Sequence, residues 1–169
     1  PAALRTAERV HHVVVGASEL GGGTLNAARG LPFSEDRPFQ EGTVPLEPIP
    51  GLAERCSAEP VYLRARDGER HDLTETDAEV WSKVEAALAQ DNTRVNVHLV
   101  AHSKTGLRAP SLAVCRRMVD TWCDRVWITV DAAQGRLAPT DIRSALAHGF
   151  VVLFTGSKFY AGPPFAGSL

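Results

Sequence analysis

The chain has 169 residues, of which 44% are hydrophobic, and its 18 basic and 20 acidic side chains give a net charge of −2. This length suffices for one domain with a real core, and the composition is ordinary for a soluble protein. No basic cluster marks a nucleic-acid surface, and no apolar run approaches the roughly 20 residues of a membrane helix. Neither a nucleic acid nor a membrane is therefore an expected partner.

The cysteines and the first residues bear on the cellular compartment. The three cysteines, Cys56, Cys115 and Cys123, are odd in number and lack the spacing of metal ligands. We therefore expect reduced thiols and no metal site. The first residues show no signal-peptide pattern, and reduced thiols are the default of the cytoplasm, which is the location we expect.

The first half of the chain predicts two strands and one irregular region. A strand over residues 11–17 runs into a glycine-rich turn at residues 21–23, where glycine's conformational freedom suits a tight strand-to-helix turn. Residues 31–60 contain six prolines and show little periodicity, so we expect an irregular excursion near the ligand-binding edge. A second strand is expected over residues 61–66, with a turn after it.

The second half alternates helix and strand patterns. Thr76 and Glu79 resemble a capping box that begins a helix ending near residue 90, and Pro110 suits the first turn of a second helix. A third helix is expected from Thr140, with Gly149 as its left-handed end. The strands between these helices are expected at residues 94–101, 126–130 and 150–154. This alternation predicts an α/β fold, with a mostly parallel sheet flanked by helices, and a single domain over residues 1–169.

Polar or glycine-rich residues follow four of the expected strands. In open α/β sheets, ligands bind in the crevice outside the carboxyl ends of the strands. Side chains that are scattered in the sequence are therefore expected to meet along one edge of the sheet.

Lys158 is the most informative residue at this edge. It follows an apolar strand and lies among small, hydroxylated and glycine residues, where its amine cannot easily reach water. Desolvation favours the neutral amine, which can attack a carbonyl group. An ordinary lysine in a surface loop is the alternative interpretation.

Three motifs in the second half resemble one enzyme family. Asp131 and Gln134 form an Asp-x-x-Gln step after a strand, and Lys158 follows in a Ser-Lys step 27 positions after Asp131. A Gly-Pro-rich segment comes next, at residues 162–167. These features resemble the fold-type I pyridoxal-phosphate enzymes, and within them the class V aminotransferase and cysteine desulfurase group.

The resemblance covers residues 94–169 well and the first half loosely. Residues 102–106 are similar to a family segment of the type Asn-Asn-Glu-Thr-Gly. The family's upstream phosphate loop, its ring-stacking histidine and its C-terminal small domain have no counterpart in these residues. The resemblance therefore implies an apparently partial large domain, with pyridoxal 5'-phosphate as its cofactor.

The resemblance also implies a role for each matching residue. Lys158 would form the Schiff base and then act as general base and acid, while Asp131 would pair with the pyridine nitrogen. Gln134 would hydrogen-bond the phenolic oxygen of the ring, and the hydroxyls of Thr155 and Ser157 would bind the phosphate. For Asp131, Gln134, Thr155 and Ser157, the alternative is a capping, surface or turn role.

Two further residues, His102 and Ser103, are candidates for contact with the cofactor ring, although a purely structural role for them is equally open. The implied function is that of a pyridoxal-phosphate-dependent enzyme, or its lysine-bearing segment, that acts on an amino acid or related amine through an external aldimine. An aminotransferase-like reaction is favoured. The small-molecule amine and a second copy in a homodimer are the expected partners.

Other functions stay open from the sequence. A noncatalytic remnant of the fold, used as a binding or assembly module, is the main alternative. A hydrolase that uses Ser157 and Lys158 is a third interpretation, but adjacent residues rarely point their side chains at each other. Beta-elimination and desulfuration begin from the same chemistry as transamination, so the visible residues do not choose among them.

Overall fold

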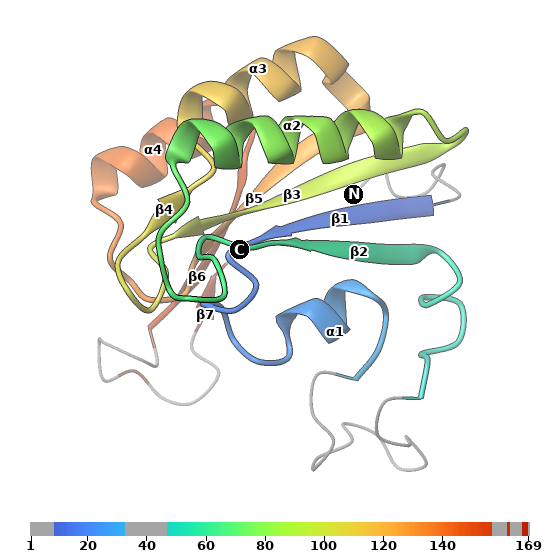
Figure 1. Ribbon diagram of the computed structural model, residues 1–169, viewed down its shortest axis with the longest axis horizontal. Coiled ribbons are helices and arrows are strands. Elements are labelled where there is room, and N and C mark those ends of the chain that lie inside the picture. The colour runs from blue at the N-terminus through green and yellow to red at the C-terminus, as the bar shows by residue number, and fades with distance from the viewer. Residues whose placement is uncertain (1–8, 33–46, 157–161, 163–166, 169) are drawn as a thin grey trace.

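The computed structural model describes residues 9–32, 47–156, 162 and 167–168. Within these residues, seven strands form one sheet in the order β2-β1-β3-β5-β6-β7, with β4 pairing to β3 (Figure 1). The strands are β1 (Arg9–Val15), β2 (Cys56–Val61), β3 (Thr93–Ala101), β4 (Arg108–Ala109), β5 (Val126–Ala132), β6 (Val151–Thr155) and β7 (Gly167–Ser168). The helices are α1 (Thr24–Ala28), α2 (Leu73–Leu88), α3 (Leu112–Trp122) and α4 (Pro139–Ala147), with a 3-10 turn at Cys123–Arg125.

The central strands of the sheet are parallel. Strand β1 pairs in parallel with β2 and β3, β3 with β5, and β5 with β6, whereas β4 and β7 are antiparallel to their neighbours. The predicted α/β class with a mostly parallel sheet is confirmed. After β1 the chain moves to β2 on one side and then crosses to β3 on the other, so the direction of winding reverses between β1 and β3. In open sheets of this kind, the reversal point is where ligands bind.

The helices α2, α3 and α4 pack on one face of the sheet, and α1 lies on the opposite side, next to β2 (Figure 1). Side chains of a strand alternate between the two faces. On the face covered by α2 and α3, Val13, Val97 and Ile128 have no exposed surface, and they form the centre of the core. The other face of the same strands carries polar side chains, among them Asn96 and Thr129.

Several predicted boundaries are corrected by the structure. The second strand lies at Cys56–Val61, not at residues 61–66, because Cys56 to Val61 pair residue by residue with β1. Pro60 is tolerated there because β2 is an edge strand and one side of its backbone needs no ladder partner.

The first turns of α2 and α3 also differ from the prediction. Helix α2 begins at Leu73, and its N-cap is Asp72, whose carboxylate accepts a hydrogen bond from the Thr74 amide at 2.7 Å. Thr76 is therefore one turn inside the helix rather than at its cap. Helix α3 begins at Leu112, after the N-cap Ser111, so Pro110 precedes the helix instead of occupying its first turn.

Other predictions are confirmed. The third helix ends before Gly149, whose φ of +73° is the left-handed conformation that glycine adopts without strain. The three cysteines are free thiols. Helix α1 follows the glycine-rich turn, where the sequence indicates a strand-to-helix connection. Strand β4 was not predicted, since two residues are too few to show a period. None of the helices in the described part of the chain combines the length and apolarity needed to cross a membrane.

Candidate functional site

The carboxyl ends of β1, β3, β5 and β6 meet at one edge of the sheet, as the sequence predicts. Asp131 lies on β5 with Val100 of β3 opposite it on one side and Leu153 of β6 on the other. Strand β6 ends at Thr155, two residues before Ser157. Ser157 and Lys158 lie outside the described residues, so their predicted roles are not tested.

Asp131 is half-buried, and its carboxylate is held by the turn that follows β5. Its Oδ1 accepts a hydrogen bond from the Ala133 amide at 3.0 Å. Gly135 closes the same turn by donating its amide to the Ala132 carbonyl at 2.8 Å, and Gln134 lies half-buried within it. The turn therefore fixes the orientation of Asp131 and places Gln134 at the same edge.

His102 and Ser103 begin the loop after β3, but their side chains differ in environment. The Nδ1 atom of His102 is buried, and no described residue hydrogen-bonds to it. An unpaired buried polar atom costs free energy, so a hydrogen-bond partner for this nitrogen would be stabilising. Ser103 is only 1% exposed, and its hydroxyl donates to Glu19 Oε2 at 2.5 Å. Contact of either residue with a cofactor stays a prediction.

Glu19 is the residue of this edge whose importance the sequence does not reveal. It lies in the loop after β1, is only 7% exposed, and accepts hydrogen bonds from Ser103, Thr105 and Arg64. Burial alone raises the pKa of this carboxyl group, but the hydrogen bonds from Ser103, Thr105 and Arg64 outweigh it, and the net pKa is lowered. The sequence does show a carboxylate in a glycine-rich loop. It does not show which residues bind that carboxylate, because they are distant along the chain.

A second polar group lies on the sheet face opposite α2. His12 Nδ1 is 2.9 Å from His98 Nε2, Asn96 Nδ2 is 3.2 Å from the same His98 atom, and the Thr129 hydroxyl donates to Asn96 Oδ1 at 2.9 Å. Burial lowers the pKa of both histidines to about 4. The nearby Asp131 acts in the opposite direction on the pKa of His98. This cluster is therefore a network of buried hydrogen bonds that connects neighbouring strands of the sheet.

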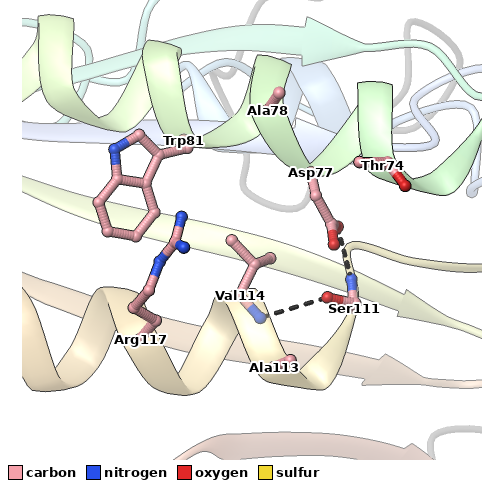
Figure 2. A pocket seen from close by; sticks show the side chains of 8 residues that line it. All are labelled: Thr74, Asp77, Ala78, Trp81, Ser111, Ala113, Val114 and Arg117. Carbon is pink, nitrogen blue, oxygen red and sulfur yellow. Dashed lines mark hydrogen bonds between the residues drawn. The ribbon is translucent and has the colours of Figure 1, made fainter.

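A groove of about 490 Å³ lies between α2 and α3, as Figure 2 shows. Several of its polar side chains already have partners within the protein. Asp77 accepts from the Ser111 amide at 2.8 Å, and the Arg117 guanidinium lies 4.1 Å from the ring centroid of Trp81. None of the sequence-predicted site residues lines this groove. It therefore does not coincide with the candidate site at the strand ends.

The chemical groups at the strand ends are two carboxylates, an imidazole, a side-chain amide and hydroxyls. Among the described residues, no three histidine, cysteine or acidic side chains are arranged to hold a metal ion. No protein-family model matches the chain, and no curated protein is significantly similar to it. The site must therefore be judged on its own geometry.

Proposed function

We propose that this chain is the central part of a pyridoxal-phosphate-dependent enzyme that acts on an amino acid or related amine. One observation carries the proposal. Asp131 lies on β5, directly beside the strand that leads to Lys158, and both strands run in parallel toward the same edge. Such a pair of strands suits a cofactor that is bound by an amine at one end and by an acid at the other.

The described residues fit this cofactor in two respects. Asp131 uses Oδ1 for its own turn, and within the described part of the chain Oδ2 has no hydrogen-bond donor. Oδ2 would pair with a protonated ring nitrogen, where each charge favours the other. His102, two residues beyond the partner of Asp131 on β3, has a buried Nδ1 that lacks a partner. A polar substituent on the cofactor ring would supply a hydrogen-bond partner for this nitrogen.

The remaining roles follow from the resemblance. When bound, pyridoxal phosphate supplies an electron sink, and the protein orients it and moves protons. Gln134 would donate to the phenolic oxygen, and the hydroxyls of Thr155 and Ser157 would donate to the phosphate. The amine of Lys158 would attach the cofactor and then carry a proton to and from the substrate carbon.

Borohydride trapping tests this proposal. The purified chain mixed with pyridoxal phosphate should develop a visible absorbance band, and borohydride should then fix the cofactor to the peptide that contains Lys158. Lys158→Ala should abolish both signals. Lys104→Ala is the matched control, because Lys104 is an exposed lysine in the loop after β3.

Two outcomes contradict the proposal. Folded protein that develops no absorbance band would favour the alternative of a noncatalytic binding or assembly module. Labelling of the same peptide in Lys158→Ala would show that another group attaches the cofactor. A mass measurement in solution tests the expected homodimer separately, since that expectation comes from the resemblance alone.

A further inference from the structure

A buried polar cluster around Glu19 lies between the carboxyl ends of β1 and β3, where the winding of the sheet reverses. Gly16 directly follows β1 with a φ of +72°, and a Cβ atom there would lie 3.2 Å from both the Leu63 and the Val100 side chains. The chain therefore turns sharply at this point. Three residues later, Glu19 points its carboxylate toward the loop that follows β3.

Glu19 contacts the loop after β3 by its side chain and its backbone. Its Oε2 accepts hydrogen bonds from the hydroxyls of Ser103 and Thr105, and its carbonyl oxygen is 3.5 Å from the Lys104 amide nitrogen that donates to it. Its other carboxylate oxygen, Oε1, accepts from Arg64 Nε at 3.1 Å. The carboxylate thus joins three loops that are distant in the sequence.

Ser103 connects the Glu19 carboxylate to the backbone of the loop by hydrogen bonds. Its Oγ donates to Glu19 and accepts from the amides of Thr105, at 3.3 Å, and Leu107, at 3.0 Å. A hydroxyl whose proton is committed to a carboxylate presents its lone pairs to the amides. Because His102 immediately precedes Ser103, the orientation of the imidazole depends on this loop conformation.

We infer that Glu19 is a positioning residue of the candidate site, which orients His102 without itself contacting the ligand. The inference rests on the proposed function, since the ligand of His102 is taken to be the cofactor ring. A glutamine at this position has the same shape but replaces one acceptor oxygen by a donor. That donor would face either the Arg64 guanidinium, which cannot accept, or hydroxyls whose protons now go to Glu19, so the hydrogen bonds that hold the loop would be weakened.

Glu59 provides a matched control for this inference. It is another ion-paired carboxylate, 2.7 Å from Lys83 Nζ and 3.0 Å from His11 Nε2, and its pKa is also lowered, although burial alone would raise it. It lies within β2 and makes no contact with the loop after β3. Glu19→Gln and Glu59→Gln therefore remove the same kind of interaction at different places.

The test compares amide hydrogen exchange and cofactor affinity in the two variants. In Glu19→Gln, exchange of the Thr105 and Leu107 amides should become at least about tenfold faster, and the Kd for pyridoxal phosphate should rise about tenfold. In Glu59→Gln, both quantities should stay near those of the unaltered protein. If Glu19→Gln does not fold, Glu19→Asp, which keeps the charge but withdraws the carboxylate from the Ser103 hydroxyl, should show the same faster exchange.

Each outcome decides one question. Unchanged exchange in the loop, or faster exchange with an unchanged Kd, overturns the positioning role of Glu19. An equal loss of affinity in Glu59→Gln overturns it as well, because the effect would then be general destabilisation. If the unaltered protein binds no pyridoxal phosphate, the proposed function fails, and the exchange comparison still decides whether Glu19 holds the loop.

Discussion

His12 and His98 form a hydrogen-bonded pair across the neighbouring strands β1 and β3. His12 Nδ1 lies 2.9 Å from His98 Nε2, and the ring centroids are 5.2 Å apart. In such a bond one nitrogen donates and the other accepts, so the accepting ring must be neutral. Asn96 and Thr129 extend the pair to β5, so the network joins three strands.

The first prediction is that acid destabilises the fold through this pair. Burial lowers the pKa of both histidines from 6.5 to about 4. Repulsion by His98 and His11 lowers the pKa of His12 further, whereas the charge of Asp131 raises the pKa of His98 and so opposes the effect of burial. Between these pH values the unfolded chain binds more protons than the native chain. The free energy of unfolding is therefore highest above pH 6.5 and falls toward pH 4, by about 1.4 kcal/mol per pH unit for each histidine. Urea unfolding between pH 7.5 and 4.5 measures this slope.

Substitutions separate the pair from the other titrating groups. His12→Gln and His98→Gln should each make the slope shallower, because one titrating group is removed. His148→Gln is the control, since His148 is exposed and belongs to no part of this network. A slope that persists unaltered in His12→Gln and His98→Gln would mean that other groups cause the acid sensitivity.

The second prediction concerns the approach of residues 52–53 to Gly30. A Cβ atom on Gly30 would lie 2.7 Å from the Ala53 amide nitrogen and 2.8 Å from its Cα, whereas a Cβ on Gly51 would meet no atom within 4 Å. Both glycines have positive φ, +72° and +77°. Gly51→Ala should cost about 1–2 kcal/mol from the conformation alone. Gly30→Ala should cost clearly more, as measured by urea unfolding, and equal costs would show that the backbone moves aside freely.

The sequence predicts the central sheet well because its signal is local. Residues 94–101 and 126–130 are short segments rich in valine, leucine and isoleucine that become buried parallel strands, and the structure has them at Thr93–Ala101 and Val126–Ala132. The common edge of the candidate site follows from this parallel order. Asp131 could be placed at that edge because the carboxyl ends of parallel neighbouring strands lie at the same edge of a sheet.

Other features depend on contacts between distant residues. The polar segment Cys56–Val61 shows no strand pattern, and it becomes β2 only because β1 offers a ladder partner. The hydrogen bond between Glu19 and Ser103 joins residues 84 positions apart. No local pattern predicts such a pair, since a serine and a glutamate in loops are common at solvent-exposed turns.

The third prediction tests the N-cap of α3. The Ser111 hydroxyl accepts a hydrogen bond from the Val114 amide at 3.2 Å, which satisfies one of the free amides of the first turn. Ser111→Ala should lower the free energy of unfolding by about 1 kcal/mol. Ser82→Ala is the control because Ser82 is exposed inside α2, and its effect should stay within about 0.5 kcal/mol. Similar effects of both substitutions would argue against a capping contribution.

The last prediction links the candidate site to the histidine pair. The charge of Asp131 raises the pKa of His98, although burial dominates and keeps that pKa at about 4. Asp131→Asn keeps the side-chain size and the acceptor for the Ala133 amide, but it removes the charge. The pKa of His98 should therefore fall further, which an NMR titration of the imidazole protons measures. Asp124→Asn, in the exposed turn after α3, should leave that titration unchanged. An unchanged pKa of His98 in Asp131→Asn would show that the charge of Asp131 does not affect the histidine network on the sheet face.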